Sequence, residues 1–404
     1  MATIQNPKSA TTVFLDQPPS CLEFCPEAPD YFIVGTYLLS ESKTDQGEIE
    51  QKKTGSLQLW KLDPVSKALS QIQRIDLPYA VFDLHFHPRQ KDLFAIASSV
   101  GTVALFQVNP SDPASNPITQ LWSKQVHEDP SIPTLFLAWA PQNWFPRPAD
   151  GFAVTFSDSR TAVFGTQGDI RDEVAEWGTF EAKQMIEVWF VALASMTSPV
   201  DDHKTQIPFM FTGNDFGSLH TRRLDGSAEI DDDEHVSPML LEHDDRARHH
   251  TAGVTAILPL PVPMVDDAPI LLTGSYDEGL RVYHATRRGE VLAEQGLDGG
   301  VWRLQPLETK VMMAMDAGNA SVTQFLVLAS CMHAGTRVVQ VSLKESGGSS
   351  EWEIEVLAKF TEHESMNYAS GFWDSGAQRK SKSEFLVVSS SFYDRRLCVW
   401  TANV

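Results

Sequence analysis

The chain has 404 residues, of which 42% are hydrophobic, and its 53 acidic side chains outnumber 32 Lys and Arg, giving a formal net charge of −21. This much apolar material supports a large core. The acidic balance argues against nucleic acid or an anionic membrane surface as a partner, because binding to phosphate needs a basic face. A basic protein partner fits better.

Along the chain, apolar residues occur in short bursts rich in β-branched and aromatic side chains, and no long stretch keeps a helical period. This pattern predicts an all-β chain. Seven segments share a small-residue turn that leads into a strand, about 45–60 residues apart. In chain order they begin at Gly55, Ser99, Ser157, Asn214, Gly274, Cys331 and Ser391. The spacing is at or above the period of four-stranded blades, so we predict a seven-bladed WD-repeat β-propeller, with the excess length in loops.

The two ends of the chain are predicted to close this ring. The N-terminal run 12–15 reads as the outer strand of the last blade, whose own strand ends near Trp400, and closure removes an exposed sheet edge. Residues 1–404 are then one propeller domain. Loop insertions are expected near 38–54 and 225–248, the second carrying the acidic run 231–234, and 346–350 reads as a Gly/Ser linker.

Several copies of the repeat have an Asp in the turn and a His about 30 residues earlier. The pairs are His127 with Asp158, His250 with Asp277 and His363 with Asp394, while Asp215 holds the turn position of the fourth copy. We interpret these residues as structural, with each His and Asp bonded to one another and holding the loops of their blade.

Signatures of known catalytic and metal sites do not occur in the sequence. The nearest cluster is His243, His249 and His250 beside Asp244 and Asp245, which we interpret as part of a solvated loop rather than a metal site. Only four cysteines are present, too few for a disulfide scaffold and without zinc spacing, which favours a reducing compartment. The polar N-terminus and the short apolar stretches predict neither secretion nor a membrane span. We therefore expect a cytoplasmic monomer with no metal and no cofactor.

The sixth copy departs from the others in a way that suggests chemistry. Its turn holds His333 where the neighbouring copies hold Asp, and Asp298 stands in the loop where a His is expected. One interpretation is a reversed pair that still holds the loops. The other is that Asp298 orients His333 as a general base on the rim of the ring.

Aromatic residues cluster near the same turns. An aromatic rim beside carboxylates suits a quaternary ammonium ligand, although packing between blades explains aromatic residues equally well. Trp302 is the strongest candidate, because glycines before it allow a backbone or ligand to approach closely. The residues proposed for this rim are Trp302, Tyr276, Phe392, Tyr393, Asp277, Glu278, Asp394, Gly299 and Gly300.

Four segments in this order give the chain a resemblance to a known family. They are 273–278 (TGSYDE), 299–303 (GGVWR), 331–335 (CMHAG) and 391–394 (SFYD), joined by 24–26 (FCP) and 35–37 (GTY). The chain resembles the WD-repeat diphthine methyl ester hydrolases of diphthamide biosynthesis. The resemblance implies removal of a methyl ester from methylated diphthine, a modified histidine of elongation factor 2 that carries a trimethylammonium group.

The resemblance transfers no catalytic residue, so the catalytic candidates rest on chemistry alone. Ester hydrolysis needs an activated nucleophile or water, with donors for the oxyanion. We favour water activated by His333 and Asp298, with the N–H groups of Gly299 and Gly300 as oxyanion donors. The nucleophile candidates on blade turns are Ser275, Ser391 and Cys331. A non-catalytic WD-repeat adaptor is the alternative function, because the fold alone does not imply catalysis.

Overall fold

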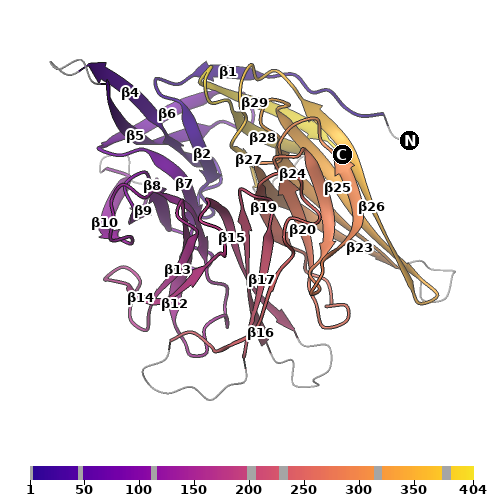
Figure 1. Ribbon diagram of the computed structural model, residues 1–404. Coiled ribbons are helices and arrows are strands. Elements are labelled where there is room, and N and C mark those ends of the chain that lie inside the picture. Colours follow the sequence, from indigo (N-terminus) through magenta and orange to yellow (C-terminus); the bar gives the residue numbers. More distant parts are fainter. Residues whose placement is uncertain are drawn as a thin grey trace.

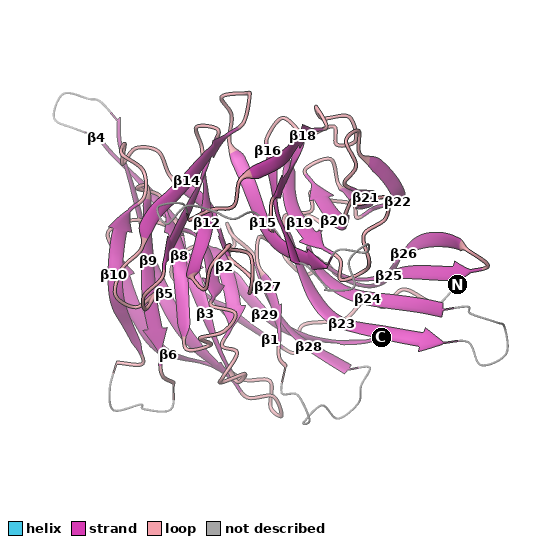
Figure 2. Cartoon of the chain, turned by 90° about the horizontal axis from the view of Figure 1, so that it is seen from below, coloured by secondary structure: helices cyan, strands magenta, loops and turns pink. Residues whose placement is uncertain are grey.

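The computed structural model describes residues 3–43, 49–110, 116–197, 206–226, 235–313, 321–374 and 384–404. Seven antiparallel sheets follow one another around a closed ring, as the colours of Figure 1 show. Strands and loops make up the whole described part of the chain, without a helix (Figure 2), so none of it offers a helix able to cross a membrane. The predicted seven-bladed β-propeller is confirmed.

Blades 1 to 3 use the first part of the chain. Blade 1 contains β2 (Pro19–Phe24), β3 (Tyr31–Thr36), β5 (Ile49–Leu62) and β6 (Leu69–Leu77), with β4 (Leu38–Lys43) paired to the first half of β5. Blade 2 contains β7 (Val81–Phe86), β8 (Leu93–Ser98), β9 (Thr102–Val108) and β10 (Ile118–Gln125). Blade 3 contains β11 (Thr134–Trp139), β12 (Asp150–Phe156), β13 (Arg160–Thr166) and β14 (Ala175–Glu181).

Blades 4 and 5 repeat the same meander. Blade 4 contains β15 (Val188–Thr197), β16 (Gln206–Asn214), β17 (Leu219–Leu224) and β18 (Met239–Asp244). Blade 5 contains β19 (Val254–Pro259), β20 (Ile270–Ser275), β21 (Gly279–His284) and β22 (Glu290–Gly296).

Blades 6 and 7 complete the ring. Blade 6 contains β23 (Arg303–Met313), β24 (Ser321–Ser330), β25 (Thr336–Ser346) and β26 (Ser349–Phe360). Blade 7 contains β27 (Ser370–Phe372), β28 (Glu384–Ser390), β29 (Arg396–Asn403) and β1 (Thr11–Phe14).

The ring closes as predicted, through the N-terminal strand. In blade 7, β1 pairs antiparallel with β29, from Thr11 opposite Val399 to Phe14 opposite Arg396. The indigo β1 therefore lies beside the yellow β29 in Figure 1. Because β29 would otherwise be an open edge, the first strand supplies hydrogen bonds that the C-terminal residues cannot make among themselves.

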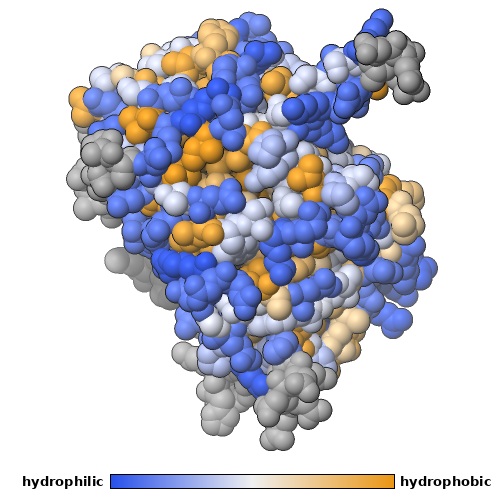
Figure 3. Space-filling view, turned by 90° about the vertical axis from the view of Figure 1, so that its left-hand side faces the viewer, coloured by the Kyte–Doolittle hydropathy of each residue, from blue (hydrophilic) through white to orange (hydrophobic). Residues whose placement is uncertain are grey.

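Burial explains which strands are apolar. The middle strands β8 and β20 are buried along their whole length, since neighbouring blades cover both of their faces, and they read as nearly continuous apolar runs. The outer strands β6 and β10 expose much of their length and alternate polar with apolar residues. The outer side of blades 1 to 3 accordingly shows apolar side chains scattered among polar ones (Figure 3).

The core is divided among the seams between blades. Seven clusters of buried apolar residues each join two neighbouring blades, including the cluster in which Leu15 and Val399 of the last blade meet Phe32 and Trp60 of the first. Each blade is therefore stabilised by both neighbours, and the seam at the chain ends is packed like the others.

The structure revises the predicted insertions. Residues 38–43 and 49–54 form a β-ribbon of β4 and β5 that reaches beyond the ring in Figure 1. Within 225–248, expected to be a loop, β18 is the outer strand of blade 4, while the acidic run 231–234 lies outside the described residues. The predicted linker 346–350 is wrong: Gly347 and Gly348, both at positive φ, make a tight turn between β25 and β26.

Candidate functional site

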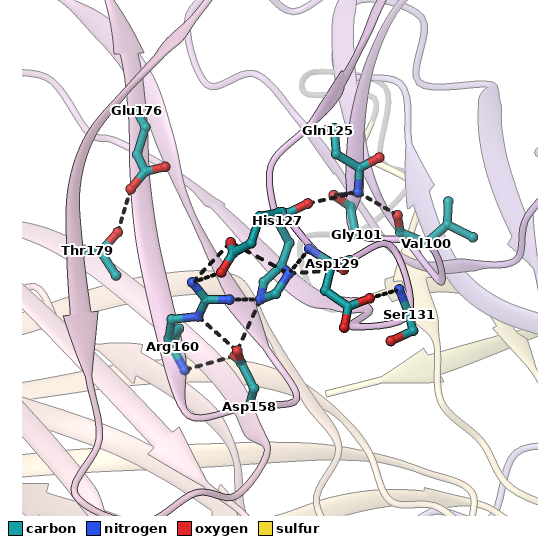
Figure 4. Close-up of polar contacts among 11 residues, drawn as sticks. Val100, Gly101, Gln125, His127, Asp129, Ser131, Asp158, Arg160, Glu176 and Thr179 are labelled. Atoms are coloured by element: carbon teal, nitrogen blue, oxygen red, sulfur yellow. Dashed lines mark hydrogen bonds and ion pairs between the residues drawn. The ribbon is translucent and has the colours of Figure 1, made fainter.

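The turn Asp and the preceding His have the predicted structural role in blade 3. His127 Nδ1 accepts the backbone N–H of Asp129 at 2.9 Å, so Nε2 is free to donate to Asp158 Oδ2 at 3.0 Å. Arg160 Nε donates to the same carboxylate at 2.8 Å, and Figure 4 shows these groups converging between two loops. The cluster ties the loop before β11 to the turn before β13.

In blades 5 and 7 the His and the Asp also hold the loops of their blade, but they do so through other partners. The predicted direct His–Asp hydrogen bonds are wrong for these two blades. His250 Nε2 contacts Thr273 Oγ1 at 2.9 Å, and His363 Nε2 contacts Ser389 Oγ at 2.8 Å. Asp277 instead accepts the backbone N–H of Thr251 at 2.8 Å. Asp394 accepts the backbone N–H of Glu364 at 3.1 Å and the Ser365 hydroxyl at 2.7 Å. Each Asp thus bonds to the residue after the His rather than to the His itself.

The structure does not bring Asp298 and His333 together. Asp298 is exposed and pairs with Lys359 Nζ at 2.6 Å and Arg337 at 3.4 Å, and Lys359 in particular holds the pKa of its carboxyl below the usual range. His333 is exposed, and no hydrogen bond or ion pair of its side chain is found in the described part of the chain. The predicted orienting contact is therefore missing, because two cations of blade 6 take the carboxylate. A catalytic role for His333 stays a prediction.

The predicted nucleophiles have structural surroundings. Ser275 is fully buried, and its hydroxyl donates to Ala252 O at 3.0 Å. Ser391 is buried and bonds to Asp394 and Ser365. Cys331 is buried, and desolvation raises the pKa of its thiol to about 12. A thiol that stays protonated near neutral pH is a poor nucleophile.

The glycine pair before Trp302 serves close packing. A Cβ on Gly299 would lie 2.4 Å from Cys331 O, and a Cβ on Gly300 would lie 2.7 Å from Met332 Sδ. The two glycines therefore let this loop lie against the sixth-blade turn. Their role as oxyanion donors stays a prediction.

At the opening of the ring, where the inner strands begin, aromatic side chains from six blades line a cavity of about 480 Å³. Its walls are Pro18, Ser20, Tyr37, Leu38, Leu39, Phe82, Trp189, Tyr276, Trp302, Tyr368, Phe392, Tyr393 and Arg395. We call this the aromatic cavity. Because each of these six blades contributes from near the start of its inner strand or from the turn before its third strand, the propeller places these residues around one axis.

The rings contact one another in sequence around the cavity. Trp302 lies 5.7 Å from Trp189, 5.8 Å from Tyr276 and 5.1 Å from Tyr368 between ring centroids. Tyr368 continues to Phe392 at 5.4 Å. The rings are tilted or edge-on to one another, so their faces and edges are presented at several angles. Such an arrangement suits a compact cation that needs several π faces at once.

Negative charge lies behind one wall of the aromatic cavity. Asp215 Oδ1 accepts the indole N–H of Trp189 at 2.7 Å, which fixes that ring. Burial raises the pKa of Tyr276, and the charges of Asp215 and Glu187 add to the effect. Tyr276 therefore stays a neutral phenol. Arg395 also lines the cavity, and its guanidinium donates to the backbone carbonyl oxygen of Asp16 at 2.9 Å.

Four of the predicted rim residues line this cavity, namely Trp302, Tyr276, Phe392 and Tyr393. The predicted rim residues outside its described lining are Asp277, Glu278, Asp394, Gly299 and Gly300. Sequence reasoning missed Trp189 and Tyr368. Each stands 26 residues before the turn Asp of its blade, so aligning the copies by their turns would have revealed both.

A second cavity of about 330 Å³ lies in the ring channel and shares Ser20 and Tyr368 with the first. Glu23 of β2, Asp83 and His85 of β7, and Arg303 of β23 line it. We call these four the channel cluster. Arg303 NH2 reaches Asp83 Oδ2 at 3.2 Å, which joins blade 6 to blade 2 across the ring. Sequence reasoning did not identify the cluster.

His85 lies between two carboxylates. Its Nε2 is 3.3 Å from Asp83 Oδ2, and its Nδ1 is 3.2 Å from Glu23 Oε2. Burial alone would lower the pKa of His85, but Asp83 and then Glu23 overcome this and raise it to about 10. Burial would likewise raise the pKa of Asp83, yet Arg303 and His85 hold it below its usual value. Near neutral pH the cluster therefore contains Asp83 as a carboxylate and His85 as a cation.

Arg303 connects the two cavities. Its guanidinium carbon lies 4.6 Å from the Trp302 ring centroid, and NH1 donates to the carbonyl oxygens of Trp302 and Thr255 at 2.8 and 3.2 Å. No group of three or more His, Cys, Asp or Glu side chains with metal-binding geometry occurs among the described residues. The cavities therefore offer aromatic faces at the mouth and fixed charges below it.

Comparison with known proteins gives sequence relatives with one recurring name. The chain is 30% identical to the diphthine methyltransferase of Schizosaccharomyces pombe over 152 residues, which span 38% of each chain. It is 22% identical to a diphthine methyltransferase homolog of Dictyostelium discoideum over 407 aligned positions, covering 96% of this chain and 98% of that one. No family model matches the sequence.

Among solved structures, Sqt1 of Saccharomyces cerevisiae shares the fold. Its crystal structure superposes with a TM-score of 0.56 at 12% identity and covers 99% of this chain and all of that one. At this identity the likeness concerns the propeller architecture alone.

Proposed function

We propose that this chain, a WD-repeat propeller of the diphthamide-biosynthesis family, hydrolyses the methyl ester of methylated diphthine on elongation factor 2. The product is diphthine with a free carboxylate, ready for amidation. The relatives support the pathway, and their names specify methyl transfer, so the direction of the methyl chemistry is the point to test.

The observation that carries the proposal is the aromatic cavity at the ring opening. A trimethylammonium group has no N–H to donate, so a protein recognises it through π faces and nearby negative charge. Trp302, Tyr276, Tyr368 and Trp189 supply the π faces, and Asp215 and Glu187 supply the charge. A modified side chain that protrudes from a protein surface fits a cavity open at one end of a ring.

The neighbouring channel supports hydrolysis rather than recognition alone. Ester hydrolysis proceeds through attack of water and an oxyanion, which need a proton acceptor and fixed donors. Carboxylates and cations line the cavity that continues from the aromatic one. The non-catalytic adaptor remains the alternative function, supported by the propeller architecture that the chain shares with Sqt1.

One incubation separates these functions. Purified protein is mixed with elongation factor 2 carrying methylated diphthine, with no methyl donor, and the modified peptide is weighed by mass spectrometry. A methylesterase removes the mass of one CH2 unit and releases methanol. If the protein instead adds CH2 units to a diphthine precursor, and does so only when S-adenosylmethionine is present, the chain is a methyltransferase. If it binds elongation factor 2 without changing its mass, the chain is an adaptor.

A further inference from the structure

We propose that Glu23 is the general base that activates the attacking water, and that Arg303 donates to the ester carbonyl oxygen. This inference rests on the proposed function and assigns its chemistry to the channel cluster instead of the sixth-blade turn. The two residues line the same cavity, which shares Ser20 and Tyr368 with the aromatic cavity.

Glu23 has the position of a base. Its Oε2 accepts from the backbone N–H of Phe86 at 3.3 Å and contacts His85 Nδ1 at 3.2 Å. For Oε1 no hydrogen bond is found within the described residues. The Glu23 side chain keeps 27% of its surface exposed, against 5% for Asp83. One carboxylate oxygen is therefore fixed by the protein, while the other can take a proton from a water molecule in the cavity.

The other titratable groups around Glu23 are poorly suited to this task. Asp83 is buried and bound by His85, Arg303 and the Leu84 N–H. His85, with its pKa of about 10, carries both ring protons near neutral pH and has no lone pair to accept another. Burial raises the pKa values of the Cys21 thiol and the Tyr368 hydroxyl, which keeps both protonated. His85 is then a positioning residue, and its contact with Oε2 at 3.2 Å holds the Glu23 side chain in place.

Arg303 has spare donors at the junction of the two cavities. A guanidinium has five N–H groups, and the bonds to Trp302 O, Thr255 O and Asp83 use three of them. Because Arg303 also stacks on Trp302, an ammonium held in the aromatic cavity leaves the ester of the same short side chain near the guanidinium. Gln305 Oε1, on the same cavity wall, is buried with no hydrogen-bond partner in the described part of the chain, and it can accept from water or methanol.

The reaction is balanced with water as the only co-reactant. Water oxygen forms a bond to the carbonyl carbon while Glu23 takes one water proton, and the oxyanion accepts hydrogen bonds from Arg303. The C–O bond to the methoxy group then breaks, and the proton on Glu23 passes to the leaving oxygen to give methanol. The acid product loses its remaining proton to solvent and leaves as a carboxylate.

The channel cluster also has a purely structural interpretation, as a strut between blades 2 and 6. The test therefore measures catalysis separately from binding and stability. Single-turnover hydrolysis and equilibrium binding of the methylated factor are compared for the natural protein, Glu23→Gln and Glu23→Asp. The matched control is Glu27→Gln, an exposed glutamate four positions along the chain.

We expect Glu23→Gln to hydrolyse ~10²–10⁴-fold more slowly per folded molecule, the usual cost of losing a general base, with unchanged affinity for the methylated factor. Glu23→Asp should recover part of the rate, and Glu27→Gln should match the natural protein. The role of Glu23 would be overturned if Glu23→Gln hydrolysed the ester at the natural rate. It would also be overturned if the fall in rate were fully explained by weaker binding. Neither result would overturn the proposed function.

Two further outcomes are also decisive. If the natural protein does not hydrolyse the ester at all, the proposed function fails and the inference fails with it. If Glu23→Gln does not fold, the rate of hydrolysis by the natural protein is measured as a function of pH. A general base stops working once it is protonated, so the rate must fall at acidic pH if Glu23 is the base. A rate that stays flat down to the acid limit of folding would contradict the proposal.

Discussion

The sixth-blade turn and the ring channel each contain a histidine that could act in catalysis, but only the channel brings its histidine into contact with carboxylates. His333 is exposed, and its expected partner Asp298 is exposed and paired with Lys359 and Arg337. His85 contacts Asp83 and Glu23 inside a cavity, with Arg303 completing the cluster. The turn stands out in the repeat, yet the channel holds the connected polar network. An irregular position in a repeat therefore marks a difference between blades, but it does not by itself mark the site.

The largest effect is expected from removing the cation of the channel. Arg303→Met leaves the buried Asp83 carboxylate without the arginine that pairs with it across the ring, so the free energy of unfolding should fall by about 3–5 kcal/mol. Denaturant titration measures this loss. The double variant Arg303→Met, Asp83→Leu should recover part of the stability, since it leaves no unpaired charge. A loss of stability below about 1 kcal/mol would show that the Arg303–Asp83 ion pair contributes no more than an ion pair on the surface.

The next effect concerns the aromatic cavity. Trp302→Ala removes a ring that contacts three other rings of the cavity. Because a desolvated cation–π contact is worth about 2 kcal/mol, we expect the affinity for the methylated factor to fall by about 30-fold. Titration calorimetry checks this value. The control is Trp352→Ala on β26 of the same blade, which packs on Phe325 away from the cavity. Equal weakening by both variants would show a general loss of packing in blade 6.

A smaller effect should depend on pH. The folded pKa of His85 is raised to about 10 from an ordinary 6.5, so protonated His85 contributes stability that is fully present below pH 6.5. This contribution is lost as the pH rises through about 10. We expect His85→Gln to be less stable than the natural protein by about 1–3 kcal/mol at pH 6, with the difference vanishing above pH 10. A difference that is constant from pH 6 to 10.5 would contradict a charged His85.

The smallest effects belong to the sixth-blade turn. His333→Ala changes an exposed side chain, so its stability should stay within about 0.5 kcal/mol of the natural protein. Asp298→Asn should cost at most about 1 kcal/mol, since the carboxylate is exposed. Hydrolysis per folded molecule, measured with both variants, is expected to stay within threefold of the natural rate, well short of the loss of a general base. A fall of more than 100-fold in His333→Ala would return the catalytic role to the turn.

The architecture of this protein could be predicted from the amino-acid pattern alone. Repeated bursts of apolar residues predict blades, and residues 12–14 of the predicted run 12–15 pair with β29. The pattern also indicated part of the aromatic cavity, through Trp302, Tyr276, Phe392 and Tyr393. These features are local: each follows from the pattern of one strand or turn, because strand propensity and burial act on neighbouring residues.

Which charged groups are in contact became clear from the folded ring and not from the amino-acid pattern. Arg303 and Asp83 are 220 positions apart, and Glu23 and Phe86 are 63 apart, yet both pairs are in contact. The physical reason is the ring, which brings the inner strand of every blade to one axis whatever the distance along the chain. The same geometry separated Asp298 from His333, since Lys359 and Arg337 of blade 6 reach the carboxylate. Contacts across a ring leave no period or spacing in the sequence, and so the channel cluster could be found only once the blades were in place.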